Sequence, residues 1–121
     1  MDADSQIQDN LRTIYRTAEF DKFYASLPKK VQDKFLYVFM LIQSIYNIST
    51  RFVKHLENTD LYEMRVSIGS NEYRSIIFAL DNPNIIEAKR IILLNGFLKK
   101  SGKDYKKQIE SAQKILNNLQ K

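Results

Sequence analysis

Residues 61–100 have the sequence LYEMRVSIGSNEYRSIIFALDNPNIIEAKRIILLNGFLKK, and this stretch decides the fold because it contains three successive β-strand patterns. Over 61–68, apolar or aromatic residues at every second position alternate with polar ones, which is the period of a half-buried strand. Residues 71–80 form a second such run. Gly69 and Ser70 separate the two runs, and glycine in first place favours a two-residue type II′ turn. The sequence therefore predicts a β-hairpin.

The turn also sets the register of this hairpin. With a two-residue loop, Arg65 lies directly opposite Arg74 on one face of the sheet, where like charges repel. One interpretation is that Glu63 and Glu72 on the diagonals neutralise the pair and make a salt-bridged, solvated face. The other is that both guanidiniums are held for an external anion, because arginine presents a bidentate fork suited to phosphate. A three-residue loop over 69–71 would instead send the two arginines to opposite faces.

A third strand is predicted over Ile85–Leu94, after a turn at 81–84. Its end, 91–94, is apolar on both faces, as in a central strand covered by helices. Gly96 marks the end of this strand, and Lys99 and Lys100 follow where the chain leaves the sheet.

The flanking segments predict one further strand and three helices. A β-prone run at 12–17 predicts the first strand, and Thr17 is a typical N-cap for a short helix that extends to Leu27. Pro28 suits the first turn of a second helix, because apolar residues then recur at helical spacing up to residue 45. Residues 51–60 are expected to be a connector. A last amphipathic helix is expected to begin with Asp104 as its N-cap.

This order, β-α-α-β-β-β-α, predicts an α+β domain with helices on one side of a mostly antiparallel, four-stranded sheet. A chain of 121 residues is long enough to bury one hydrophobic core without metal or disulfide support. We expect residues 12–121 to form that single domain. A frayed acidic tail is expected at 1–11.

Composition and charge narrow the function classes. The absence of cysteine and the presence of a single histidine exclude disulfide frameworks, thiolate metal sites and histidine-cluster metal sites, so no metal or cofactor is expected. The N-terminus is acidic and polar, unlike a signal peptide, and the longest apolar run, 35–42, is shorter than the roughly 18 residues that suggest a membrane span. A cytoplasmic protein with no membrane partner is therefore expected.

The net charge of +5 is concentrated at the C-terminal end. Residues 99–121 contain seven lysines and two acids, which accounts for an excess of +5. A basic end on a compact domain favours a polyanionic partner such as nucleic acid.

No glycine-rich phosphate loop, zinc-protease helix or nucleophile elbow is present, and no Ser/His/Asp or Cys/His combination suggests covalent catalysis. What remains is a set of cations near the hairpin and the ends of its neighbours: Lys54, Arg65, Arg74, Lys99 and Lys100. Such a set can bind phosphate and stabilise charge that develops on oxygen in a phosphoryl transition state. His55 could act as a general base because histidine titrates near neutrality, although a structural role is the commoner one for a lone histidine.

Four motifs occur in a specific order and spacing: LYEMR at 61–65, EYR at 72–74, ILLNGFLKK at 92–100, and the helical segment 109–112. Together they resemble the RelE/HigB superfamily of bacterial toxins, most of all its phage-derived Gp49-like branch, over residues 12–116. The resemblance implies a RelE-like fold and the toxin of a type II toxin–antitoxin system. Such a toxin cleaves mRNA in the ribosomal A site and is silenced by a cognate HigA-like helix-turn-helix antitoxin.

The resemblance also implies site residues. The expected catalytic residues match the family's strand arginines and its Phe-x-Lys-Lys motif: Arg65, Arg74, Lys99 and Lys100. The expected RNA-binding residues are Lys54, His55, Lys103 and Tyr105. Several family members place an acid or base near the C-terminus, where this chain offers only Tyr105, so a lysine would have to act as the base.

Two other function classes stay open. ParE toxins share the fold but inhibit DNA gyrase without cleaving RNA, and the fold alone does not separate the two activities. A basic module that binds RNA without cutting it would carry similar charges. The paired arginines and the Lys-Lys motif favour the nuclease.

Overall fold

The computed structural model describes residues 11–120, which form an α+β domain of three helices and six strands. The strands are β1 (Thr13–Arg16), β2 (Val53–His55), β3 (Leu61–Ile68), β4 (Asn71–Ala79), β5 (Arg90–Leu93) and β6 (Phe97–Leu98). The helices are α1 (Ala18–Ala25), α2 (Lys29–Ser44) and α3 (Gly102–Leu119). The predicted fold class is confirmed, and the arrangement is consistent with a RelE-like fold. The acidic tail expected at 1–11 lies, except for Leu11, outside the described residues.

The sheet is mixed, with the strand order β1-β5-β4-β3-β2. β1 pairs with β5 in parallel, and the pairs β5–β4, β4–β3 and β3–β2 are antiparallel, as the prediction of a mostly antiparallel sheet required. The sheet contains two strands more than the four that were predicted. β2 arises within the expected connector 51–60 because Val53–His55 pairs with β3, and β6 extends the edge of β4 beyond β5.

The β3–β4 hairpin has the predicted two-residue turn. Gly69 has a φ of +58°, a value that glycine adopts without steric cost. Ile68 pairs with Asn71, and Arg65 consequently pairs with Arg74. Both arginines therefore lie on the same face of the sheet, as the hairpin register predicted.

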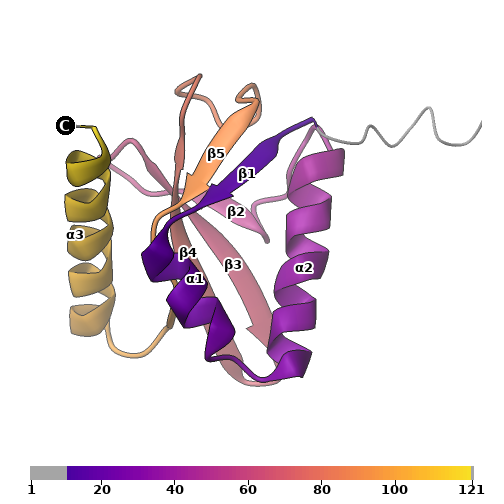
Figure 1. Cartoon of the computed structure of the whole chain (residues 1–121), viewed down its shortest axis with the longest axis vertical. Helices are drawn as coiled ribbons and strands as arrows, with labels where there is room; N and C mark the ends of the chain where they lie inside the picture. Colours follow the sequence, from indigo (N-terminus) through magenta and orange to yellow (C-terminus); the bar gives the residue numbers. More distant parts are fainter. Residues whose placement is uncertain (1–10, 121) are drawn as a thin grey trace, which may run out of the picture.

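Helices cover both faces of the sheet, not one as expected (Figure 1). On one face, α1 and α2 bury Phe20, Phe35 and Ile42 against strand residues such as Met64. On the other face, α3 contributes a second core, which contains Leu61, Ile76, Leu94, Phe97, Ala112 and Leu116. The second layer is needed because both faces of β4 carry buried side chains. It places α3 directly over the face that carries the two arginines.

The N-cap residues fix where α1 and α3 begin, and for α3 this determines which side chains reach the sheet. Thr17 caps α1 as predicted, because its Oγ1 accepts a hydrogen bond from the Phe20 N–H at 3.1 Å. The N-cap of α3 is Ser101 and not Asp104, since the Ser101 hydroxyl oxygen accepts from the Asp104 N–H at 3.1 Å. The helix therefore begins earlier than expected, and Tyr105 lies within its first turn and a half.

The third strand is shorter than predicted, since β5 begins at Arg90 and not at Ile85. Residues 84–88 form a turn in which the N–H groups of Glu87 and Ala88 both donate to the Asn84 carbonyl at 3.0 Å. The guanidinium of Arg12 donates to the carbonyls of Ile85 and Ile86 and so helps to hold these residues in the turn.

Arg12 joins this turn to the end of α2. Its side chain is 1% exposed, and it also donates to three carbonyl oxygens near the C-terminus of α2: those of Ile42, Ile45 and Tyr46. These carbonyls lack helical partners, so the buried guanidinium satisfies them. Burial lowers the pKa of Arg12 from its ordinary value, while the nearby Tyr46 and Glu87 act in the opposite direction.

β5 and β6 both pair with the same side of β4, and residues 94–96 separate the two strands. The Asn95 Oδ1 accepts from the Ile76 N–H at 3.0 Å, and its Nδ2 donates to the Gln108 carbonyl of α3 at 3.0 Å. A Cβ at Gly96 would lie only 2.1 Å from the ring of Phe23. The glycine thus lets the chain pass this ring and reach the hairpin again as β6. No helix within residues 11–120 is long and apolar enough to cross a membrane.

Candidate active site

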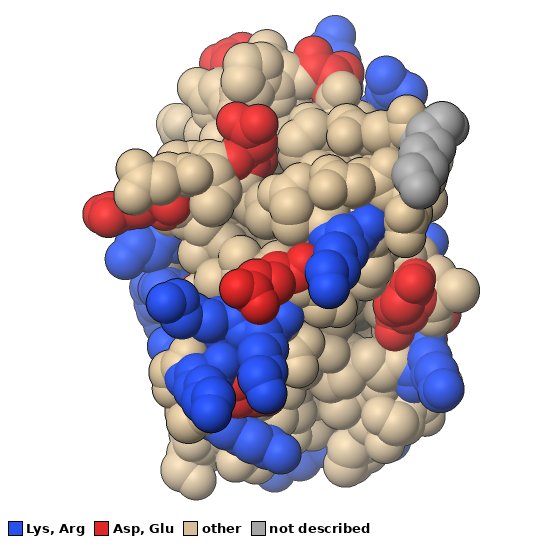
Figure 2. All heavy atoms as spheres, turned by 90° about the vertical axis from the view of Figure 1, so that its left-hand side faces the viewer, with Lys and Arg blue, Asp and Glu red and all other residues tan. Residues whose placement is uncertain are grey.

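The predicted catalytic residues meet on the face of the sheet that α3 covers. Arg65 and Arg74 are register partners on β3 and β4, and Phe97 of β6 pairs with Arg74 on the other side. The N–H of Lys99 donates to the Glu72 carbonyl at 2.8 Å, so this lysine follows directly along the same edge. Figure 2 shows Lys and Arg side chains gathered toward the end of the molecule where α3 begins.

A buried carboxylate, that of Glu63, lies between the two arginines. Its Oε1 is 2.8 Å from the Nε of Arg65 and 3.3 Å from the Nε of Arg74. Its Oε2 accepts a hydrogen bond from the Tyr105 hydroxyl of α3. The Glu63 side chain is only 1% exposed. Glu63 therefore neutralises the arginine pair as one interpretation predicted, but it does so beneath α3 and not on a solvated face.

The two arginines are held differently. Arg74 is 7% exposed, and its Nη1 donates to the Glu72 carboxylate at 3.1 Å and to the Tyr73 carbonyl at 3.0 Å. Its buried Nε lies within ion-pair distance of Glu63 but is not aligned for a hydrogen bond. Arg65 is 29% exposed, and its only side-chain hydrogen bond within residues 11–120 is the one from Nε to Glu63. The terminal nitrogens of Arg65 therefore remain available to a ligand.

An open hollow of about 410 Å³ adjoins Arg74. It is lined by Ser70, Asn71, Glu72, Arg74, Leu98, Lys99 and Lys100. The ammonium of Lys99 lies 5.1 Å from the centre of the Tyr105 ring, which is a cation–π contact. The lining contains three cations against one carboxylate, so its net charge suits an anion such as phosphate.

Glu72 and Tyr105 show how this cluster affects ionisation. A hydrogen bond from Ser67, and further bonds and charge from Arg74, lower the pKa of Glu72, although its partial burial acts in the opposite direction. Burial raises the pKa of Tyr105, and its hydrogen bond to Glu63 raises it further. The Tyr105 hydroxyl consequently stays protonated at neutral pH, which fits a hydrogen-bond donor and not a general base.

The structure separates the predicted RNA-binding residues into three groups. Tyr105 lies in the cluster, and the exposed Lys54 lies at its border, because Lys54 pairs with Glu63 across β2 and β3. His55 is on the opposite face, where its ring lies 5.1 Å from that of Tyr62 and its Nε2 is 2.8 Å from the Thr59 carbonyl. Lys103 is exposed in the first turn of α3, and its side chain makes no hydrogen bond or ion pair within residues 11–120.

Sequence reasoning treated Glu63 only as a diagonal counter-charge and did not foresee its burial. The sequence did contain a signal for this burial. Glu63 and Arg65 are two positions apart and so lie on the same face of the hairpin, and the apolar side of the last amphipathic helix had to cover one face of the sheet. Asn95, which connects β4 to α3, gave no signal beyond its place before Gly96.

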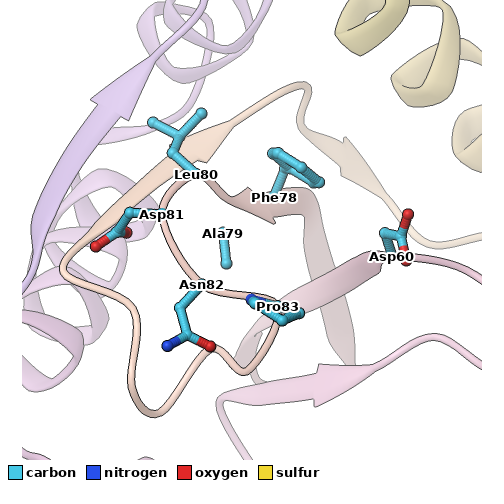
Figure 3. Close-up of a pocket in the computed structure, with 7 residues that line it drawn as sticks. All are labelled: Asp60, Phe78, Ala79, Leu80, Asp81, Asn82 and Pro83. Atoms are coloured by element: carbon cyan, nitrogen blue, oxygen red, sulfur yellow. The ribbon is translucent and has the colours of Figure 1, made fainter.

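A second hollow of about 350 Å³ lies at the far end of β4, around Asp60 and residues 78–83 (Figure 3). The carboxylate of Asp81 there already accepts from the N–H groups of Lys89 and Arg90. None of the described residues that line this hollow is Lys or Arg, so it does not suit a phosphate. Within residues 11–120, no three acidic or histidine side chains are grouped to hold a metal ion.

Comparison with known proteins agrees with this geometry. Residues 22–117, from α1 to α3, match the family described as "Phage derived protein Gp49-like". This family includes RelE/HigB-like toxins and is associated with toxin–antitoxin systems. No curated protein and no solved structure gives a significant match. Because the match covers most of the chain and includes the whole β3–β6 region, the chain belongs to the phage-derived Gp49-like family.

Proposed function

We propose that this chain is the toxin of a type II toxin–antitoxin system and that it cleaves mRNA on the ribosome. The observation that carries the proposal is the arginine pair held by Glu63 beside the lysine-lined hollow. The hollow is lined by Arg74, Lys99 and Lys100, and Arg65 is paired with Arg74 across the hairpin, so this set of cations suits a phosphodiester better than a neutral ligand. The Gp49-like family membership supports the same assignment.

The proposed reaction is attack of a ribose 2′-hydroxyl on the adjacent phosphate. The new O2′–P bond forms as the P–O5′ bond breaks, which leaves a 2′,3′-cyclic phosphate and a 5′-hydroxyl. Negative charge on the phosphate oxygens rises in the transition state, and the cationic donors that line the hollow are Arg74, Lys99 and Lys100. The terminal nitrogens of Arg65, the register partner of Arg74, are a further donor that we assign to the phosphate. Loss of one such donor costs about 2.7–4 kcal/mol of transition-state stabilisation.

The reaction also requires a base for the 2′-hydroxyl proton and an acid for the leaving oxygen. Tyr105 is occupied as a donor to Glu63, and His55 lies on the opposite face of the sheet. The Glu72 carboxylate, which also lines the hollow, is bonded to Ser67 and Arg74. We therefore assign proton transfer to Lys99 and Lys100. Lys54 and Lys103 extend the positive surface along which an RNA strand would lie.

The test is expression of the full chain in bacteria, followed by growth measurement and mapping of mRNA ends. Growth should stop, mRNA should be cut within translated regions, and co-expression of a neighbouring helix-turn-helix antitoxin should restore growth. Such a toxin would act in the cytoplasm, where its substrate is translated. Arrest with intact mRNA and stalled gyrase would instead assign the ParE-like activity, and RNA binding without cleavage would assign the non-catalytic class.

A further inference from the structure

The position of Glu63 is not explained by phosphate binding alone. A carboxylate repels a phosphate, so an acidic residue at the centre of a phosphate site should weaken binding. Glu63 is nevertheless buried there, with contacts from three elements: Arg65 on β3, Arg74 on β4 and Tyr105 on α3. Burying an ionised carboxylate is costly unless it is paired and hydrogen-bonded, and these contacts meet that requirement.

The contacts of Glu63 are all on one edge of each guanidinium. Its Oε1 accepts a hydrogen bond from the Arg65 Nε at 2.8 Å and forms an ion pair, without a hydrogen bond, with the Arg74 Nε at 3.3 Å. A guanidinium carries five N–H donors in a rigid plane, so fixing the Nε edge also fixes the direction of the terminal nitrogens. In Arg65 these terminal nitrogens make no hydrogen bond within the described residues. In Arg65 the carboxylate thus binds the Nε edge and leaves the terminal nitrogens to a ligand, whereas Nη1 of Arg74 is already bonded to Glu72 and to the Tyr73 carbonyl.

Without such an anchor, the register of the hairpin would work against the site. Arg65 and Arg74 are direct cross-strand partners, and two unshielded cations in that position repel and rotate apart. The shared carboxylate holds them together before any RNA phosphate is present. Tyr105 fixes the second carboxylate oxygen from α3, so helix packing determines where the arginines point.

We propose that Glu63 is a positioning residue for phosphate: with Tyr105 as its own anchor, it holds Arg65 by a hydrogen bond from Nε and Arg74 by an ion pair, so that the two arginines are ordered in the free protein. The substrate in this proposal, an RNA phosphodiester, rests on the proposed function. The positioning itself has a readout that does not depend on cleavage.

The first experiment compares the wild-type chain, Glu63→Gln and a matched control, Asp21→Asn. Asp21 is also bound to an arginine, Arg16, at 3.1 Å, but lies on α1 outside the site, so the control removes the same charge elsewhere. NMR spectra of the arginine Nε–Hε groups report whether Arg65 and Arg74 are ordered. We expect their two dispersed signals to collapse toward the solvent-exposed position in Glu63→Gln and to be unchanged in Asp21→Asn.

The second readout separates kcat from substrate binding. In Glu63→Gln, the kcat for mRNA cleavage should fall by about 100-fold, as expected when a catalytic group is misplaced by about 1 Å. The affinity for an uncleavable RNA with a 2′-deoxy scissile position should be equal or higher, because one negative charge has been removed. A merely structural role would not give this split, because partial unfolding reduces activity and binding capacity together.

Wild-type kcat and ordered signals of both arginines in folded Glu63→Gln would overturn the proposal. So would parallel losses of activity and binding capacity that follow the folded fraction. If Glu63→Gln does not fold, Tyr105→Phe provides the same test, because it removes only the hydrogen bond to Oε2 of Glu63. Shifted Nε–Hε signals of the arginines, with a lower kcat and an unchanged RNA affinity, would support the positioning role of Glu63. Unchanged Nε–Hε signals would refute it. Absence of cleavage by the wild-type chain would refute the proposed function, whereas the NMR comparison would still decide the role of Glu63.

Discussion

Replacing Arg74 with Ala should destabilise the domain more than the same change at Arg65, although both variants should lose cleavage. Arg74 is 7% exposed and lies 3.3 Å from the buried Glu63 carboxylate, so its truncation leaves that charge with one cation fewer. Removal of one partner from a buried ion pair costs about 3–5 kcal/mol, and the lower end applies because Arg65 stays on the same oxygen. Arg65 is 29% exposed, so water can replace it at a cost of about 1–2 kcal/mol.

These free energies translate into separable melting temperatures. The unfolding entropy of about 2.1 cal/mol/K per residue corresponds to about 0.25 kcal/mol/K for this chain. Arg74→Ala should therefore lower Tm by about 12 °C and Arg65→Ala by about 4–8 °C. In both variants, kcat/KM for mRNA cleavage on programmed ribosomes should fall by at least about 100-fold, measured at a temperature where each variant is folded.

The comparison is decided by calorimetry and cleavage measured on the same protein samples. Equal Tm losses in the two variants would contradict the different burial of the arginines. Full cleavage by either folded variant would refute the phosphate-binding role of that arginine. Arg65→Lys is a useful control, because it keeps the charge but lacks the fork, and it should recover only part of the activity.

Three further changes test the fold that supports the site. Arg12→Met should lower the free energy of unfolding in urea by at least about 3 kcal/mol, because buried carbonyls lose their donor, and a loss below about 1 kcal/mol would contradict this role. Gly96→Ala should cost about 1–3 kcal/mol by thermal melting because its Cβ meets the Phe23 ring, whereas Gly102→Ala, with open space around it, should not destabilise. Because the pKa of Tyr105 is raised in the folded state, its protonated hydroxyl stabilises the fold at pH values below the unfolded pKa of about 10, and this contribution is lost as pH rises through the folded pKa. In urea titrations above pH 10, the free energy of unfolding of the wild-type protein should therefore fall more steeply with pH than that of Tyr105→Phe.

Local sequence determined the hairpin and, through it, the arginine pair. Gly69 accepts the positive φ that a two-residue turn requires, and this single turn places Arg65 opposite Arg74. The N-cap at Thr17 and the helical period of α2 were likewise readable, because caps and periodicity involve residues only a few positions apart. The order and spacing of the short motifs pointed to the Gp49-like family that the comparison then showed.

Tertiary structure alone decided how these residues are supported. The burial of Glu63 depends on Tyr105, 42 residues later, and the late start of the predicted third strand depends on Arg12, 73 residues before Ile85. His55 was separated from the site by one position of strand alternation in β2, a strand that exists only because β3 is there to pair with it. A sequence gives the position of an arginine or glutamate but not whether water or protein surrounds its side chain, because only long-range packing determines that.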